Sequence, residues 1–189
     1  MTVGRETAAA RGAVILPYNG ARPTIAPDAF VAPTTAIIGD VTIGASSGVW
    51  FQCVLRGDER PIRIGARCNI QDSTVVHVSG RPGGQGTDIG DETSIGHMAV
   101  IHACTLEPGS FIGMGSIVLD NAVVESGAMV AAGSLVTPRT RVKSGELWSG
   151  RPARLWRPLT DDDRDRMQQT VKTYVERARE YLSALGAGR

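Results

Sequence analysis

Aliphatic side chains recur at every sixth position along most of this chain. A helix repeats every 3.6 residues and a half-buried strand every two, so neither explains a spacing of six. Glycine often follows the aliphatic residue directly, as at Gly44, Gly65 and Gly96. The aliphatic positions are Ile25, Val31, Ile37, Ile43, Val49 and Leu55; Ile64, Ile70 and Val76; Ile89, Ile95 and Ile101; and Leu106, Ile112, Val118, Val124, Val130, Val136 and Val142.

This period predicts a mainly β fold over residues 13–158: a solenoid of short strands separated by tight corners. Each aliphatic residue would point into the shaft, while small or polar residues would form the corners. A β-sandwich with irregular short strands is the alternative. It does not predict an aliphatic residue at nearly every sixth position over such a length, so the solenoid is favoured.

Three interruptions divide the repeat into blocks. Three extra residues lie between Leu55 and Ile64, and a larger insertion containing SGRPGGQGTD lies between Val76 and Ile89. One residue is missing between Ile101 and Leu106. Insertions in a solenoid are expected to form loops on its outside, where binding groups are often found.

The chain changes character at its C-terminal end, where residues 159–186 are predicted to form one α-helix. Thr160 is a suitable N-cap, three aspartates follow it, and Gly186 is a suitable stop. We expect this helix to lie along the shaft, with its tyrosines packed against it. Residues 1–12 are predicted to be disordered. The apolar residues at helical spacing are Met167, Val171, Tyr174, Ala178, Tyr181, Leu182 and Leu185.

Composition excludes several classes of partner. With 20 Lys+Arg and 19 Asp+Glu residues, the chain is nearly neutral, which argues against nucleic acid or an anionic membrane surface as a partner. No apolar run is long enough to cross a bilayer, and the N-terminal apolar patch at residues 13–16 is too short for a signal peptide. Cys53, Cys68 and Cys104 form no CxxC pair, which predicts reduced, buried thiols in a cytoplasmic protein.

The stretch from Asn69 to His102 contains all three histidines of the chain, His77, His97 and His102. A catalytic zinc site needs three protein ligands and one open position, so three histidines are sufficient to hold zinc. Iron or cobalt would also suit this set of ligands. Three unrelated histidines on the surface or in the core are the ordinary alternative, and only the repeat around them favours a shared site.

Several motifs within the repeat resemble those of one family. They are VLRGDERPIRIGARCNIQDSTVVHV, then IGHMAVIHACTLE, then LWSGRPARLWRPL. Together they are similar to the γ-class carbonic anhydrases, hexapeptide-repeat proteins in which three hexads form one triangular coil of a left-handed parallel β-helix. The resemblance covers about residues 14–185. It implies a homotrimer in which a zinc-bound hydroxide reversibly hydrates carbon dioxide to bicarbonate.

Counting three hexads to a coil places the histidines in columns. Arg56, His77 and His102 then stack on the same side of successive coils, while Asp72 and His97 stack on a different side. Neighbouring coils are separated by roughly 4.8 Å, so two stacked imidazoles can reach one metal. The third ligand is therefore expected from a neighbouring shaft. The family resemblance independently implies two ligands from one subunit and one from the next.

The resemblance also implies roles for other residues. Arg56 and Asp72 correspond to a pair that ties adjacent subunits together, as a bidentate arginine and carboxylate can do. An ordinary surface ion pair is the alternative. Gln71 and Asp58 correspond to groups that hydrogen-bond the zinc-bound water and each other. Tyr174 lies where the family often has an Asn-Tyr pair near the site, but Thr173 takes the place of the Asn here.

Glu59 corresponds to a carboxylate that relays protons in the family. The family also has a longer acidic loop with a second relay carboxylate, whereas residues 79–87 here form a short segment without an acid. Because all three histidines are used as ligands and an ordinary carboxylate is a poor proton acceptor at neutral pH, weak activity limited by proton release is expected.

Other functions remain open from the sequence. One is a hexapeptide acyltransferase that uses acetyl-CoA and a histidine base. Others are a metal-bearing hydrolase that attacks thioesters, and an assembly protein with little carbonic anhydrase activity. The acyltransferase does not require three converging histidines, whereas the thioester and assembly alternatives cannot be separated from carbon dioxide hydration by sequence.

Overall fold

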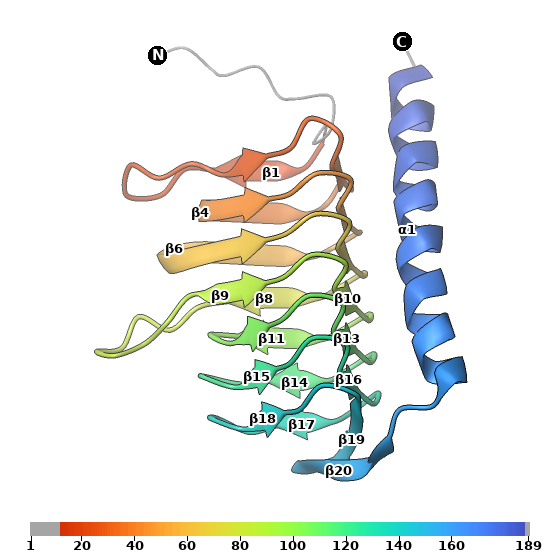
Figure 1. The fold of residues 1–189 in the computed structure, drawn as a ribbon. Helices are drawn as coiled ribbons and strands as arrows, with labels where there is room; N and C mark the ends of the chain where they lie inside the picture. Colours follow the sequence, from red (N-terminus) through yellow and green to blue (C-terminus); the bar gives the residue numbers. More distant parts are fainter. Residues whose placement is uncertain (1–11, 188–189) are drawn as a thin grey trace.

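In a computed structural model, residues 12–187 are described, and they form a parallel β-solenoid with one α-helix along its side (Figure 1). The prediction of a mainly β fold built of hexapeptide repeats and followed by a C-terminal helix is confirmed. The segment predicted to be disordered, residues 1–12, lies outside the described residues except for Gly12.

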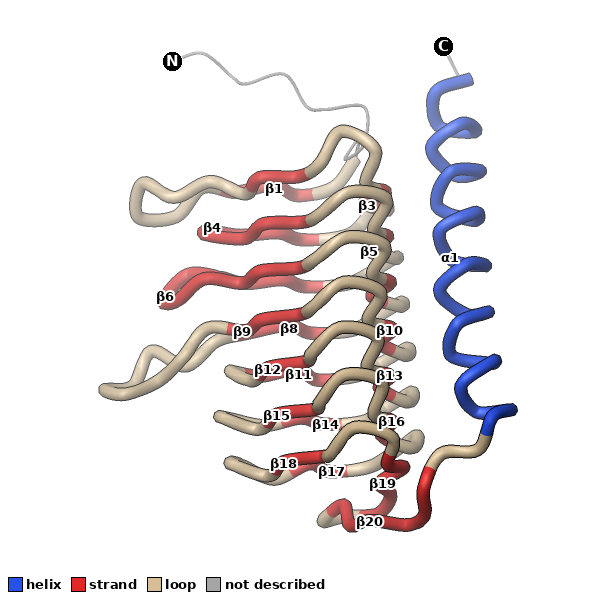
Figure 2. Tube along the Cα trace, viewed as in Figure 1, coloured by secondary structure: helices blue, strands red, loops and turns tan. Residues whose placement is uncertain are grey.

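The strands fall on three faces and stack coil upon coil (Figure 2). The first face carries β1 (Val14–Leu16), β8 (Val75–His77), β11 (Val100–His102), β14 (Ile117–Val118) and β17 (Leu135–Val136). The second carries β3 (Phe30–Val31), β5 (Gly48–Val49), β7 (Asn69–Ile70), β10 (Ser94–Ile95), β13 (Phe111–Ile112), β16 (Met129–Val130) and β19 (Glu146–Gly150). The third carries β2 (Thr24–Ile25), β9 (Thr87–Ile89), β12 (Thr105–Leu106), β15 (Val123–Val124) and β18 (Arg141–Val142).

Two longer strands join the first face to the third. These are β4 (Ala36–Ile43) and β6 (Val54–Ile64), which pair with each other in parallel. The insertion between Leu55 and Ile64 was expected to form an outside loop, and this expectation is wrong. Gly57 pairs with Gly39 and Ile62 with Val41, so the extra residues form a bulge within a continuous strand. The strand persists because the backbone on both sides of the bulge still pairs with β4.

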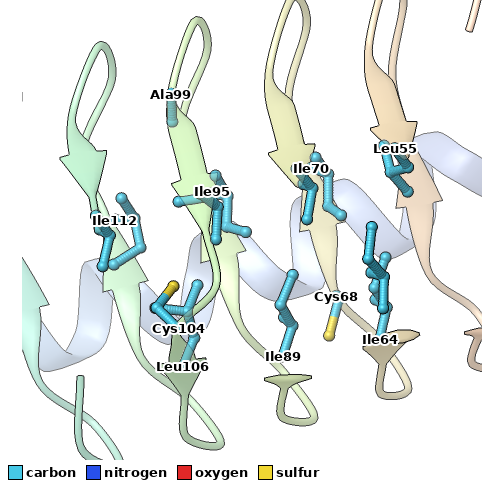
Figure 3. Packing of buried hydrophobic residues seen from close by; sticks show 14 of the residues in the cluster. Leu55, Ile64, Cys68, Ile70, Ile89, Ile95, Ala99, Cys104, Leu106 and Ile112 are labelled. Atoms are coloured by element: carbon cyan, nitrogen blue, oxygen red, sulfur yellow. The ribbon is translucent and has the colours of Figure 1, made fainter. Parts of the chain in front are cut away.

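The period of six describes the core. Every aliphatic position of the repeat is buried except Ile25, which is only partly buried and packs against the core at the first coil. Residues at equivalent positions stack in register, as Ile70, Ile95 and Ile112 do (Figure 3). Each such side chain contributes about 1.5–3 kcal/mol by leaving water.

Glycine follows several core positions because successive coils approach closely there. A Cβ added at Gly44 would lie 2.5 Å from the carbonyl carbon of Gly65, and one added at Gly113 would collide with the backbone nitrogen of Ala132. Neither neighbour is a flexible side chain, so the backbone itself would have to move. The glycines noticed in the sequence therefore permit the coils to stack.

The last coil is closed by an antiparallel pair. Strand β20 (Ala153–Pro158) turns back on β19, and the chain then enters α1 (Asp161–Ala187). Thr160 caps the helix: its Oγ1 accepts a hydrogen bond from the backbone nitrogen of Asp163 at 3.2 Å. The carboxylate of Asp163 accepts one in return from the backbone nitrogen of Thr160 at 2.8 Å. The helix continues through Gly186, its predicted stop, to Ala187, the last described residue.

Helix α1 lies along the second face and covers it with aromatic contacts. The ring centroid of Trp50 is 5.3 Å from that of Tyr174 and 5.4 Å from that of Tyr181, and Ala178 is buried beside them. Both tyrosines therefore pack against the shaft. Within residues 12–187, no helix combines the length and apolar character needed to cross a bilayer.

The stacked core generates a first prediction. We expect Ile95→Ala to lower the free energy of unfolding by about 2–5 kcal/mol, because it opens a cavity between two coils that cannot collapse. Ile25→Ala, at the partly buried end of the same core, should cost clearly less. Denaturant unfolding at fixed protein concentration measures both, and equal losses would contradict this account of the core.

Candidate metal centre

Two of the three histidines stack at one corner of the solenoid. His77 ends β8 and His102 ends β11, and the parallel register of these strands pairs the two residues directly. Their ring centroids are 5.3 Å apart, and both rings are partly buried. The predicted stacking of His77 and His102 is thus present, because the strand register places the His102 imidazole directly over that of His77 in the preceding coil.

A cleft of about 730 Å³ opens beside this pair. It is lined by Glu59, His77, His102 and Asp120, and by residues 78–84 of the segment between β8 and β9. That segment projects from the solenoid in Figure 1, as expected for the larger insertion. A second hollow of about 470 Å³ lies between α1 and the solenoid, and none of the three histidines lines it.

The bulge of β6 brings charged groups to the His77 corner. Oδ1 of Asp58 is 3.2 Å from Nε2 of His77, and its other oxygen accepts a hydrogen bond from the Arg56 guanidinium. Burial alone would raise the pKa of Asp58, but the hydrogen bonds from Arg56 and His77 outweigh it and hold the pKa below its ordinary value. Asp58 is therefore a carboxylate throughout the neutral range.

Glu59 lies next to this pair, over Gly80. A Cβ added at Gly80 would collide with the carboxyl group of Glu59, so the glycine leaves room for this side chain. Ligand atoms of Asp58, Glu59 and His77 all lie within 4.8 Å of one another, a group that could itself hold a cation.

The residue that sequence reasoning missed is Asp120. Its Oδ1 is 2.7 Å from Nδ1 of His102. Burial would raise the pKa of this carboxyl, but hydrogen bonds from His102 and Ser79 outweigh it and lower the pKa. The repeat count does not single out Asp120, because the coil after His102 lacks one residue: Ile101 pairs with Val118, so Asp120 lies one position past the residue in register with His102.

His97 stands at a different corner, in the turn after β10. Its Nδ1 is 2.8 Å from Oδ2 of Asp72, so these two form the second predicted column. Tyr174 of α1 is close by: burial, and then the charge of Asp72, raise the pKa of its hydroxyl. Gln71 is buried there, and its Nε2 donates to Oδ1 of Asn69 at 3.0 Å.

One chain therefore brings the predicted site residues together in two groups. The first contains Arg56, Asp58, Glu59, His77 and His102, and the second contains Gln71, Asp72, His97 and Tyr174. Within the described residues, Arg56 pairs with Asp58 rather than with Asp72, and Gln71 bonds Asn69 rather than Asp58. The pairings that the family resemblance implied for these residues stay predictions.

The donor set suits zinc. An ionised aspartate can only accept hydrogen bonds, so Nδ1 of His102 donates to Asp120 and Nε2 of the neutral ring keeps a lone pair for a metal. Nδ1 of His97 likewise lies against a carboxylate oxygen, Oδ2 of Asp72, at 2.8 Å. Neutral imidazoles of this kind are common zinc ligands.

The cysteines do not add to this set of donors. They are buried and form no disulfide. Burial raises the pKa of Cys53 to about 12 and that of Cys68 to about 11, so these thiols remain protonated.

Several known proteins with similar sequences are named carbonic anhydrases. Gamma carbonic anhydrase 2, mitochondrial, from Arabidopsis thaliana is 48% identical over 166 residues, which cover 85% of this chain and 59% of that protein. The protein named carbonic anhydrase from Geobacillus kaustophilus is 42% identical over 168 residues, which cover 89% of this chain and 91% of that protein. The chain thus spans about 60% of the length of the Arabidopsis relatives and most of the Geobacillus one.

The solved structures agree on the fold. A hexapeptide transferase family protein from Anaplasma phagocytophilum superimposes with a TM-score of 0.84 at 47% sequence identity, covering 89% of this chain and 98% of that one. No protein-family model matches the chain. The sequence identity over nearly the whole Geobacillus protein, the hexapeptide solenoid and the stacked histidine pair together show that this chain belongs to the γ-class carbonic anhydrase family.

Proposed function

We propose that this chain forms a homotrimer that reversibly hydrates carbon dioxide to bicarbonate at zinc sites shared between neighbouring subunits. The observation that carries the proposal is the division of the histidines: His77 and His102 stack at one corner, and His97 stands at another. A site with three imidazole ligands and one open position therefore needs a second copy of the chain. Membership of the γ class supports the reaction.

An uncovered apolar face supports the assembly. The outward side chains at the start of the first face form one continuous apolar column, in which Val14 is 49% exposed and Val75 38% exposed. The other five members are half-buried, and a continuous apolar strip of this kind is typical of a surface that contacts another protein. Its members in register are Val14, Ala36, Val54, Val75, Val100, Ile117 and Leu135.

The other two faces need no partner. Helix α1 covers the second face, where Phe30 and Gly48 are buried beneath it. The third face presents a mostly polar column to water: Thr24, Thr42, Arg63, Asp88, Thr105, Val123 and Arg141. Another copy that covers the first face would also meet the adjacent row of Arg56, His77 and His102. Three copies related by a closed ring would cover the first face of every copy.

The residues of the chain divide the chemistry among them. When held by three neutral imidazoles, zinc lowers the pKa of its water to about 7 and so supplies the nucleophile for carbon dioxide. His77, His97 and His102 would hold it. Gln71, whose amide is buried and fixed on Asn69, would orient the attacking water together with Asp58. Iron or cobalt would suit the same imidazoles.

Glu59 is placed to take the proton that each turnover releases. It lines the same cleft as His77 and His102, at a point open to solvent. The segment 79–87, of which residues 79–84 line the cleft, contains no acidic residue, so Glu59 is the carboxylate best placed for this transfer. Proton release is therefore proposed as the slow step.

An acyltransferase is the second candidate, favoured by the likeness to the hexapeptide transferase family protein from Anaplasma. Such an enzyme needs one histidine as a base, whereas here each of the three histidines contacts its own carboxylate. Paired imidazoles of this kind are typical of metal ligands. The metal-dependent reaction is therefore the better account.

The apolar column generates a prediction about assembly. Val100→Asp should convert the trimer into single chains, because it places a charge in the middle of the buried contact. Thr105→Asp is the matched control: it introduces the same charge on the outward side of the neighbouring strand, on the polar third face. Light scattering should give three times the chain mass for the wild type and the control. A monomeric wild type would contradict the shared-site proposal.

Shared sites also predict complementation between two inactive variants. His77→Ala and His97→Ala should each lose most of their zinc as pure trimers. In a trimer that contains both kinds of subunit, one interface joins an intact His77 to an intact His97, so about one zinc should return per mixed trimer. Metal analysis after dialysis measures this. If mixing restores no zinc, the histidines do not come from two chains.

Proton release gives a prediction about buffer. Glu59→Gln should lower turnover roughly 10-fold or more in dilute buffer, because the transferred proton loses its acceptor. Imidazole buffer should restore the rate at constant pH and ionic strength, because it accepts the proton directly. Stopped-flow measurement of carbon dioxide hydration tests both effects.

Two further variants sharpen the buffer experiment. Gly80→Ala should act in the same direction as Glu59→Gln, since the added methyl group displaces the Glu59 carboxyl. Glu92→Gln, which removes a surface carboxylate paired with Arg67 at 2.9 Å, should leave the rate unchanged. High activity that is indifferent to buffer in all of these proteins would exclude Glu59 as the proton acceptor.

A further inference from the structure

Asp120 is held in place by the backbone of three successive coils. It stands in the turn after β14, one coil beyond His102. Its carbonyl oxygen accepts a hydrogen bond from the backbone nitrogen of Arg139 at 3.0 Å, and the next residue, Asn121, donates from its backbone nitrogen to Ala103 at 2.7 Å. The position of the carboxylate is therefore set by the stacked coils rather than by a free loop.

The contact between Asp120 and His102 selects one form of the imidazole. A carboxylate has no proton to donate at neutral pH, so the hydrogen in this 2.7 Å contact belongs to Nδ1 of His102. The lone pair of the neutral ring then lies on Nε2. Without this acceptor, the ring could turn about its side-chain torsion and populate either tautomer.

The other two histidines show how specific this contact is. Oδ2 of Asp72 lies 2.8 Å from Nδ1 of His97, but this pair does not form a hydrogen bond like that between Asp120 and His102. Asp58 instead approaches Nε2 of His77, at 3.2 Å, and it also binds Arg56. Asp120 makes no ion pair with any described residue other than His102.

We propose that Asp120 is a positioning residue, which accepts the Nδ1 hydrogen of His102 and so keeps Nε2 as the nitrogen that binds the metal. This assignment rests on the proposed function, because it takes His102 as a zinc ligand. In metal sites generally, loss of such a carboxylate weakens metal binding by about 10- to 100-fold.

The test compares zinc affinities. Asp120→Ala, which removes the acceptor, should weaken zinc binding about 10- to 100-fold in competition with a chromophoric chelator. Asp120→Asn keeps an acceptor oxygen without the charge, so its affinity should fall between those of Asp120→Ala and the wild type. Asp28→Asn is the matched control: this aspartate also lies in a solenoid turn and accepts a hydrogen bond from Ser46 at 2.8 Å, but it is remote from the histidines.

A second measurement needs no variant. Nitrogen-15 NMR of the metal-free wild type should show His102 with its hydrogen on Nδ1, and Asp120→Ala should show a mixture of tautomers. Wild-type zinc affinity in Asp120→Ala, or an Nε2–H tautomer in the wild type, would overturn the assignment while leaving the proposed function intact. A wild-type trimer that binds no zinc would overturn both.

Discussion

Backbone pairing between successive coils is the interaction on which the rest of this structure depends. Each coil forms parallel ladders with the coils above and below it. Equivalent residues of successive coils therefore place their side chains at the same position around the solenoid. Stacked aliphatic residues fill the shaft and leave no room for a shifted register, because a slip would expose them. The register that stacks Ile101 on Val76 in the core also stacks His102 on His77 at the corner.

The three faces of the solenoid differ in what covers their outward side chains. Helix α1 covers the second face, and the third face presents polar side chains to water. The apolar column from Val14 to Leu135 on the first face is not covered by any other part of the described chain. Because the histidine pair lies beside that column, the exposed apolar surface and the proposed metal site coincide. Assembly and function are therefore coupled in the proposal: the contact that buries the apolar face is the one that would complete the ligand set.

Interruptions of the repeat place the charged groups around the site. The bulge in β6 carries Asp58 and Glu59 to the corner occupied by His77, while the segment after His77 lines one side of the cleft. Neither change disturbs the core, since the flanking residues Leu55, Ile64, Val76 and Ile89 remain buried in the shaft. A regular repeat supplies the scaffold, and its irregularities supply the charged groups.

The sequence by itself determined the period, the identity of the core residues and the two histidine columns. This was possible because three repeats make one coil, so the number of residues between two positions tells which side of the solenoid each one occupies. Family motifs, rather than physics, indicated the roles of Gln71, Asp58 and Glu59. Only the tertiary structure decided that the first insertion remains a strand, that Glu59 lies over Gly80, and that Asp120 holds His102. These depend on where side chains meet across coils, and on whether inserted residues find backbone partners. A spacing of six cannot encode either, because it describes the positions that repeat and not the contacts made where the repeat is broken.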